Sequence, residues 1–361
     1  MVYIKPFKAT KLPTTYKIDK ELMNLLSEAS AKYGEYKAML NALEFEAELF
    51  LKSVLKSDSY KSTQIEGTQV LYEDIFSLDT IKENDDSLEI KNLIKSIEFA
   101  YENIKENGIT MNLVNEMHKI ILNSGRGATK SPGKIRDIQN WIGPRGADIE
   151  QATFIPPSPD DVIEYLINLY EYMNDAYIDP VLVNVAISHA QFETIHPYKD
   201  GNGRLGRALI PIQMAYLTDD KPMLYLSEII EINKLGYQRA LMNTRRGNLE
   251  SFIKFFMQCT IDQCSNYIRK LEIIKNIYKE DTEKIKNIKG SSIHTVFPLM
   301  MKKIVFTNKY IQEQTGLALS TVTRIVNQLL DLGILVDISK GRKKEYRYDR
   351  IYKVFIGTGI Y

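Results

Sequence analysis

The sequence is poor in cysteine and has no long hydrophobic run. Its two cysteines, Cys259 and Cys264, share an apolar stretch without the spacing of a zinc site, so we expect two buried thiols. No uncharged run is long enough to span a bilayer, and the N-terminus lacks the apolar segment of a signal peptide. These absences predict a reduced, cytoplasmic protein that makes no membrane contact.

An excess of charge of one sign is also missing. Lys and Arg number 47 and Asp and Glu 46, which gives a net charge of +1 over 361 residues. Any contact with nucleic acid therefore has to come from a local patch. Hydrophobic residues make up 44% of the chain, which is enough for a packed core, and a chain of this length predicts two or three domains.

Apolar residues recur at spacings of three and four through most of the chain, which predicts a mainly α fold. Residues 125–159 break this rhythm, because IQNWI and ATFIP indicate two short strands around the turn GPRGAD. Residues 265–290 form a lysine-rich helical pattern. Beyond it, 291–361 shows the order helix, turn, helix, strand and basic turn of a winged helix-turn-helix.

The run ETIHPYKDGNGRLGRALI, residues 193–210, carries the groups of a nucleotide-transfer site. Its glycines lead into a helix whose first N–H groups favour a phosphate. Arg204 and Arg207 share a face in the first turn of that helix, where two cations need anions. Asp200 offers the oxygen ligand that Mg²⁺ prefers. His196 is the one nearby side chain able to take a proton at neutral pH.

The string HPYKDGNGRLGR resembles the Fic signature, His-Pro-Phe-x-(Asp/Glu)-Gly-Asn-Gly-Arg-x-x-Arg, with Tyr198 in place of Phe. The resemblance implies transfer of AMP from ATP to a Ser, Thr or Tyr hydroxyl of a target protein, with release of pyrophosphate. It implies that His196 deprotonates the hydroxyl and that Asp200 holds Mg²⁺ between the α- and β-phosphates. The remaining phosphate ligands that it implies are Gly201, Asn202 and Gly203 as an anion hole and Arg204 and Arg207 on the outer phosphates.

A second string, STQIEG, fits the family's inhibitory motif, (Ser/Thr)-x-x-x-Glu-(Gly/Asn), through Ser62, Glu66 and Gly67. The resemblance implies that Glu66 pairs with Arg207 and withholds this arginine from the γ-phosphate, so that ATP binds in an unproductive pose. Without the catalytic motif, an ordinary surface glutamate would be the better interpretation. In some relatives the equivalent glutamate also supports removal of AMP, so deAMPylation stays an alternative.

The Gly/Pro-rich stretch 133–157 lies where the family has its flap, a hairpin that holds the target by strand addition. The candidate flap residues are Ile138, Gln139, Trp141, Phe154 and Ile155, with a structural hairpin as the alternative. Tyr237 is a candidate for the nucleoside pocket, and core packing fits it equally well. His189 is expected to be structural, and the sequence around His118 indicates no role.

The C-terminal unit has a more generic pattern. TVTRIVNQLLDLG would be a recognition helix, followed by a turn rich in Lys and Arg at residues 340–347. Such a patch fits phosphate contact, and the unit fits protein docking or a homodimer as well. A DNA-binding regulator with a nucleotide-sensing Fic site is therefore an alternative to the enzyme, as is another phosphate-group transfer by the same site.

The sequence thus predicts four segments and a set of partners. The segments are 1–110 with the inhibitory motif, 111–264 as the Fic catalytic core, 265–290 as a helical linker and 291–361 as the winged helix. The expected partners are ATP with Mg²⁺ and a protein bearing a hydroxyl side chain, which includes the chain itself. DNA, a protein partner or a second copy are the alternatives for the winged helix.

Overall fold

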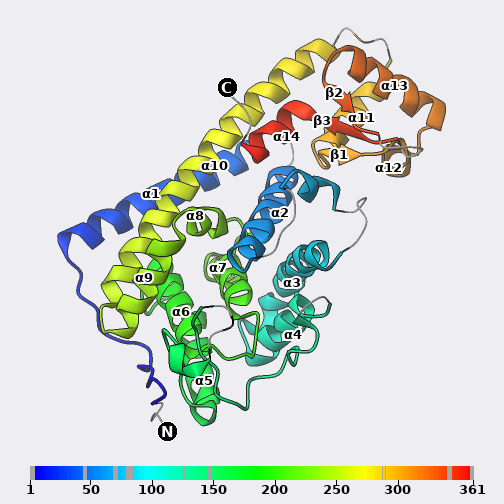
Figure 1. Cartoon of the computed structure of the whole chain (residues 1–361). Helices are drawn as coiled ribbons and strands as arrows, with labels where there is room; N and C mark the ends of the chain where they lie inside the picture. The colour runs from blue at the N-terminus through cyan, green and yellow to red at the C-terminus, as the bar shows by residue number, and fades with distance from the viewer. Residues whose placement is uncertain are drawn as a thin grey trace. The chain divides into compact units, whose positions relative to one another are not determined.

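The structure is a computed structural model that describes residues 5–43, 47–67, 72–78, 84–124, 127–144, 146, 148–286, 288, 290–339 and 344–357. It is mainly helical, which confirms the predicted fold class (Figure 1). The described residues fall into two compact units. The first lies within Met1–Tyr33, Asp58–Val70 and Lys82–Gln263, and the second within Gly34–Ser57, Leu71–Ile81 and Cys264–Tyr361. The predicted segment boundaries stay a prediction.

The first unit is built mainly of helices. Its helices are α3 (Asp85–Asn107), α4 (Met111–Ile121), α5 (Pro159–Asn174), α6 (Val181–Ile195), α7 (Asn202–Thr218), α8 (Ser227–Ile232) and α9 (Lys234–Arg245), with a short 3-10 turn at Ile149–Gln151. Helices α1 (Lys20–Asn41), α2 (Glu48–Ile65) and α10 (Leu249–Ile285) each contribute residues to both units. Helix α7 packs against α3, α4, α5 and α6, so the segment that carries the motif lies in the core.

Local sequence explains where these helices begin. Asn84 starts α3 with a capping box, since its side chain accepts from the Ser87 N–H at 2.7 Å while Ser87 Oγ accepts from the Asn84 N–H at 3.0 Å. Thr110 caps α4 with a single bond, since its Oγ1 accepts from the Leu113 N–H. Helix α6 is apolar and buried on all sides, as expected of a helix in the middle of a domain.

The N-terminal segment runs extended along the first unit before α1. The Asn168 side chain of α5 holds both backbone groups of Leu12, with distances of 2.7 Å. The Phe7 N–H donates to the Ile155 carbonyl at 3.1 Å, and its ring packs edge-on against Phe154. The segment therefore covers one edge of the predicted flap.

The second unit holds a 3-10 helix from the N-terminal part of the chain together with the C-terminal elements. They are the 3-10 helix η1 (Tyr72–Ser77), α11 (Ser292–Met300), β1 (Val305–Phe306), α12 (Asn308–Thr315), α13 (Leu319–Asp331), β2 (Leu335–Asp337), β3 (Tyr346–Tyr348) and α14 (Asp349–Ile356). The strands form an antiparallel sheet in the order β1-β3-β2, with Val305 opposite Arg347 and Leu335 opposite Tyr348. Most of the predicted basic turn, residues 340–343, lies outside the described residues. The winged-helix assignment stays a prediction.

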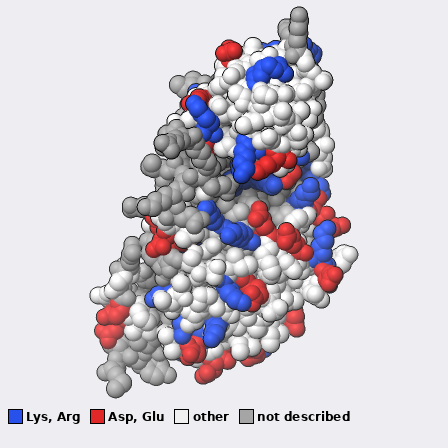
Figure 2. Space-filling view, turned by 90° about the vertical axis from the view of Figure 1, so that its right-hand side faces the viewer, with Lys and Arg blue, Asp and Glu red and all other residues white. Residues whose placement is uncertain are grey.

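Two expectations from composition can be compared with the structure. Cys259 and Cys264 are free and buried, as predicted. In the described residues we find no helix with both the length and the apolarity that a membrane crossing requires. Basic and acidic side chains lie next to one another on the face shown in Figure 2, in line with the small net charge.

Candidate active site

The predicted catalytic loop connects α6 to α7 (Figure 1). Helix α6 ends where His196 adopts a left-handed backbone, φ 49°, and α7 begins directly after its N-cap Gly201, φ 77°. Asn202 closes the loop, because its Oδ1 accepts from the Tyr198 N–H at 2.9 Å and its Nδ2 donates to the Tyr198 carbonyl at 2.8 Å. These bonds hold the loop as a tight turn that leads directly into the N-terminus of the buried helix α7.

Tyr198 of this loop stacks on His118 of α4. The buried Tyr198 donates its hydroxyl to Asn115 at 2.7 Å, and its ring stacks on His118 with centroids 3.8 Å apart. His118 Nδ1 accepts from the Gly133 N–H at 2.9 Å, so Nε2 carries the proton and donates to the Asp200 carbonyl at 2.9 Å. Burial lowers the pKa of His118 to about 4, which keeps this neutral form at pH 7. His118 therefore has the role of holding the loop, which sequence reasoning missed.

A buried arginine holds the other side of the loop. The Arg136 guanidinium donates to the carbonyls of Ile195 and His196 at 3.4 and 3.0 Å, and to those of Ile138 and Pro157 in the flap region. The end of α6 carries unpaired carbonyls with partial negative charge, which a guanidinium satisfies well. Arg136 thus connects the predicted catalytic loop to the predicted flap. Sequence reasoning missed it, because a basic residue in a Gly/Pro-rich stretch resembles a surface residue.

The His196 imidazole faces this loop in a neutral form. Its Nδ1 is buried and has no hydrogen-bond partner in the described part of the chain. Burial, together with the nearby cations Arg245 and Arg136, lowers the pKa of His196 to about 3. The imidazole is therefore neutral at pH 7 but a weak base, and its basicity would rise once negative charge enters the site.

Glu66 and Arg207 form the predicted ion pair, with Nη2 and Oε1 2.8 Å apart. Arg207 is almost inaccessible, and it also donates to the hydroxyl and the carbonyl of Ser62 at 2.9 and 2.8 Å. The Glu66 side chain is 42% exposed, so water partly screens the pair. Burial raises the pKa of Glu66, but the charges of Arg207 and Arg204 outweigh it, and the net pKa is lowered.

The same carboxylate lies against the first turn of α7. A Cβ added at Gly203 would stand 2.5 Å from Glu66 Oε1 and 2.9 Å from Arg207 Nη1. Glycine at this position is therefore what lets the carboxylate approach the helix. Glu66 occupies a place where the N-terminus of a helix favours an anion. Gly67, the last residue of the motif, follows α2 with φ 94°.

The end of α2 that bears Glu66 is held by α8 and α9. The buried Asp58 accepts from the N–H and the hydroxyl of Ser227 at 2.7 and 2.9 Å. Lys61 pairs with Glu231 at 3.3 Å, and the Lys234 ammonium donates to the Ile65 carbonyl at 2.6 Å. These contacts fix the helix end without touching Arg207.

Arg204 and Asp200 lie on the other side of the first turn. The buried Arg204 lies 3.5 Å from Glu89 of α3 and 3.6 Å from Asp200 Oδ1, and its Nε has no hydrogen-bond partner in the described residues. Asp200 Oδ1 also accepts from the Gly201 N–H at 2.6 Å, and its carboxylate remains about half exposed. The described residues contain no group of three or more His, Cys, Asp or Glu that could hold a metal. One accessible carboxylate suits Mg²⁺ that takes its other ligands from water and phosphates.

Part of the predicted site lines one cavity of about 640 Å³, whose lining does not include Asp200, Gly201, Asn202 or Arg204. Its lining includes Glu66, Glu193, His196, Gly203 and Arg207. The walls come from α9 and the flap and include Tyr237, Leu241, Met242 and Arg245, with Ile142, Gly143, Pro144 and Thr153. Cavities of this size hold small ligands such as nucleotides. The structure therefore places the predicted base and one of the two arginines in a single space with Glu66.

Tyr237 belongs both to the cavity and to the core. Its buried hydroxyl lies 2.8 Å from His189 Nε2, and His189 Nδ1 lies 3.1 Å from the Gly206 carbonyl. Since Nδ1 faces a carbonyl, it carries the proton, and Nε2 accepts from the tyrosine. His189 thus links α9 to α7 and has the contacts of a structural histidine.

The predicted flap is less regular than two strands. A single antiparallel bridge joins Ile142 to Phe154, with hydrogen bonds of 2.9 and 3.1 Å. The Phe154 side chain is buried, and its ring centroid lies 3.8 Å from Cζ of the Arg245 guanidinium. The Ile155 carbonyl accepts from the Phe7 N–H. Gln139 Nε2 donates to the Pro156 carbonyl at 3.0 Å. Of the candidate flap side chains, Ile138 and Trp141 are the exposed ones, at 57% and 39%.

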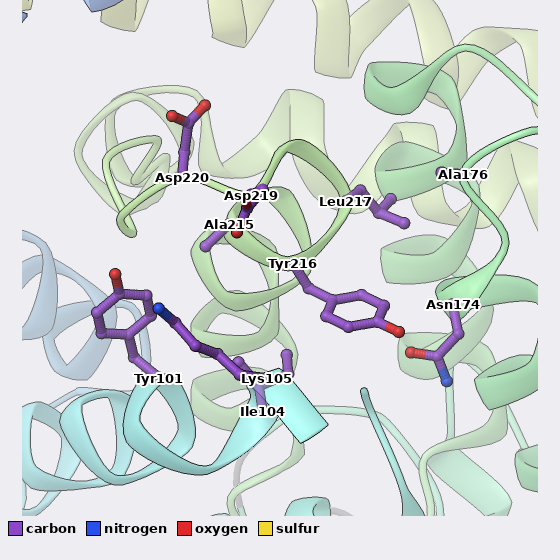
Figure 3. A pocket seen from close by; sticks show the side chains of 10 residues that line it. All are labelled: Tyr101, Ile104, Lys105, Asn174, Ala176, Ala215, Tyr216, Leu217, Asp219 and Asp220. Carbon is purple, nitrogen blue, oxygen red and sulfur yellow. The ribbon is translucent and has the colours of Figure 1, made fainter. Parts of the chain in front are cut away.

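A second cavity, of about 350 Å³, lies at the opposite end of α7 (Figure 3). It contains none of the predicted site residues. Asn174 in its wall holds both backbone groups of Ile109, at 2.8 and 2.9 Å, which is a structural role. Lys105 and Asp219 at its rim are exposed to solvent. This cavity therefore offers no chemistry comparable to that of the first.

Two family models match the chain. The Fic/DOC family model matches residues 108–214, and the Fic/DOC family N-terminal model matches residues 23–102, which together make up just over half of the sequence. The chain is 24% identical over 192 residues to protein adenylyltransferase fic-1 of Caenorhabditis briggsae, and 25% identical over 192 residues to fic-1 of Caenorhabditis elegans. Each alignment covers 52% of this chain and 34% of the relative, so the chain spans about a third of the length of these curated relatives.

Solved structures of Fic proteins share the fold. A Fic family protein from Desulfovibrio desulfuricans G20 has a TM-score of 0.59 at 17% identity, covering 92% of this chain and 97% of that one. Residues 134–508 of Fic-1 from C. elegans give a TM-score of 0.56 at 20% identity, covering 70% of this chain and 73% of that one. With both family models matched and the signature loop formed at the start of α7, the chain belongs to the Fic/DOC family.

Proposed function

We propose that this chain transfers AMP from ATP to a Ser, Thr or Tyr hydroxyl of a target protein, in a site that Glu66 holds shut. The observation that carries the proposal is the neutral His196 imidazole in the same cavity as the glycine–arginine N-terminus of α7. A base and an anion cradle in one enclosed space are what phosphoryl chemistry needs. The names of the curated relatives support AMP as the transferred group.

In the proposed reaction the target hydroxyl gives its proton to His196. The hydroxyl oxygen forms a bond to the α-phosphorus while the bond to the β-phosphate oxygen breaks in line, and pyrophosphate leaves. Backbone N–H groups of the loop and the Arg204 and Arg207 guanidiniums would hold the phosphates. The charge of the bound phosphates would raise the low pKa of His196 and make it a better base.

Mg²⁺ has one candidate ligand in this site. The Asp200 carboxylate is accessible and lies beside the first turn of α7, where the α- and β-phosphates would lie. When bound, Mg²⁺ neutralises charge on the phosphates of the reacting nucleotide. The role of Asp200 would be to fix the position of that charge next to Arg204.

The inhibition follows from competition between two anions. The Glu66 carboxylate holds Arg207 at 2.8 Å and touches the space above Gly203. A γ-phosphate needs the same guanidinium, and two anions cannot share it without strong repulsion. ATP can then bind only with its outer phosphates displaced, out of line with the target hydroxyl.

The test compares the wild type with Glu66→Gly and with Glu66→Gly combined with His196→Ala. We expect Glu66→Gly, incubated with ATP and Mg²⁺, to place AMP on itself or on added lysate proteins well above the wild-type level. Intact-protein mass spectrometry would detect the added AMP. The double variant should show none, because it lacks the base. A silent Glu66→Gly variant that still binds ATP would sink the proposal.

A further inference from the structure

Glu193 is a buried acidic side chain that the proposed reaction does not use. It lies one turn before His196 in α6 and lines the main cavity together with His196 and Arg207. The residue is 5% exposed, and its Oε1 has no hydrogen-bond partner in the described part of the chain. Buried carboxyls without a partner are costly, so this one calls for an explanation.

The backbone of α7 comes close to this carboxyl. A Cβ at Gly206 would stand 2.5 Å from Glu193 Oε1, so the approach depends on the missing side chain at position 206. The Glu193 carbonyl accepts from Arg245 at 3.0 Å, which fixes the backbone at this point. The carboxyl is therefore held in one place, between α6 and α7, at the wall of the cavity.

Charged and titratable groups reach Glu193 from each neighbouring element. They are Glu66 at the end of α2, His196 beyond its own helix, Arg207 of α7, and Tyr237 and Arg245 of α9. Neither arginine lies within ion-pair distance of the Glu193 carboxyl among the described residues. Burial raises the pKa of Glu193 to about 7, against the opposing effect of Arg207.

A triphosphate that reaches Arg207 brings several negative charges into this cavity. An ionised Glu193 would repel them, whereas a carboxylic acid has a proton to donate to an oxygen. We propose that Glu193 takes part in nucleotide binding as a neutral carboxylic acid, and that its ionisation weakens the binding of a triphosphate. The inference rests on the proposed function for the choice of ATP as the ligand.

The sign of the pH dependence follows from this scheme. Above the pKa that Glu193 has in the protein without ATP, binding of ATP takes up one proton from solvent. The affinity for ATP therefore falls about tenfold per pH unit. Well below that pKa the group contributes no dependence. Glu193→Gln has the shape of the neutral acid and cannot ionise, so it should remove this part of the pH profile.

The experiment uses Glu66→Gly/His196→Ala as the parent, which frees Arg207 and prevents turnover. Loss of Glu66 removes one negative charge that raises the pKa of Glu193. The affinity for ATP therefore begins to fall no higher than about pH 7. ATP with Mg²⁺ is titrated calorimetrically from about pH 6 to about pH 9 into the parent and into the parent with Glu193→Gln. The titration of ATP itself is common to both proteins and cancels in the comparison.

We expect nearly equal affinities near pH 6 and binding about thirtyfold tighter in the Gln variant near pH 8.5. Identical profiles would overturn the inference, as would loss of ATP binding at every pH in a Gln variant that unfolds at the parent temperature. Absence of ATP binding in both proteins would overturn this inference and the proposed function together. The expected profile without AMP transfer by Glu66→Gly would overturn the proposed function alone.

Discussion

Replacing Glu66 with glutamine removes the negative charge from the contact that we propose to be inhibitory and preserves its shape. Arg207 keeps its two bonds to Ser62 and can still donate to the amide oxygen at position 66. Arg207 stays charged in this variant, so its bond to the amide is still charge-assisted, and what is lost is the attraction between two full charges. Because Arg207 is buried while the Glu66 side chain is 42% exposed, we take this loss as about 1–1.5 kcal/mol, between the values for exposed and for buried pairs.

This loss predicts a graded series of activities. A destabilisation of about 1–1.5 kcal/mol raises the competent fraction, and hence the initial rate of AMP transfer, about five- to tenfold in Glu66→Gln. Complete removal in Glu66→Gly, worth about 1.5–3 kcal/mol, should raise it about ten- to hundredfold. The assay is the initial rate of incorporation of labelled AMP into protein at fixed ATP and Mg²⁺.

Glu231→Gln is the matched control. Glu231 pairs with Lys61 at 3.3 Å on the same end of α2, but it does not contact Arg207. If the carboxylate at position 66 acts by occupying Arg207, this control should stay near the wild-type rate. Equal activation by Glu231→Gln and Glu66→Gln would refute the reasoning, since it would mean that loosening the helix end is sufficient.

Three further outcomes are expected. Gly203→Ala should abolish AMP transfer even in the Glu66→Gly background, because its Cβ would fill the space 2.9 Å from Arg207 Nη1 where the phosphate has to lie; undiminished transfer in an initial-rate assay would contradict this. Arg136→Met removes the guanidinium from the buried carbonyls of Ile195 and Pro157, whereas the His196 carbonyl keeps its bond from Asn140, so urea titration should show a loss of about 1–3 kcal/mol for each carbonyl left unpaired; unchanged stability would rule out the capping role. Tyr198→Phe loses the bond to Asn115, about 1 kcal/mol in the same titration, with the rate of transfer kept, because the stacked ring remains; a silent variant would show that the hydroxyl matters to the loop.

The contiguous parts of the site could be predicted from the sequence. Residues 196–207 act through their neighbours in the chain, since a glycine turn and a helix start are local structures. Glu66 could be predicted because its motif has a fixed spacing, although its partner lies 141 positions away. Tyr198, which stands where the signature has phenylalanine, has its ring buried in the core.

The supporting residues could not be predicted in this way. His118 contacts Asp200 across 82 positions, and Arg136 contacts His196 across 60, so their roles depend on the packing of separate helices. No local pattern distinguishes a buried Arg136 from a solvated one. Glu193 was part of the motif segment, but its burial follows from the close approach of α7 at Gly206, which is visible only in the fold.

The flap shows the limit of a pattern based on β propensity. IQNWI and ATFIP predicted two strands, and one bridge between Ile142 and Phe154 formed. Side-chain contacts replace the missing ladder, because Gln139 and Arg136 bond to backbone carbonyls of the return segment. The extended N-terminal segment then covers the edge at Ile155. A target segment that adds as a strand would have to pair with the first segment of the predicted flap, which bears the exposed Ile138 and Trp141.

The most direct test of the central claim is the fate of the label in Glu66→Gly incubated with ATP and Mg²⁺. Two parallel reactions use ATP labelled on the α-phosphate or on the γ-phosphate, and protein-bound label is counted after denaturation. AMP transfer predicts label on protein from α-labelled ATP alone, with the γ-label released in pyrophosphate. Label on protein from γ-labelled ATP, or from neither, would contradict the account.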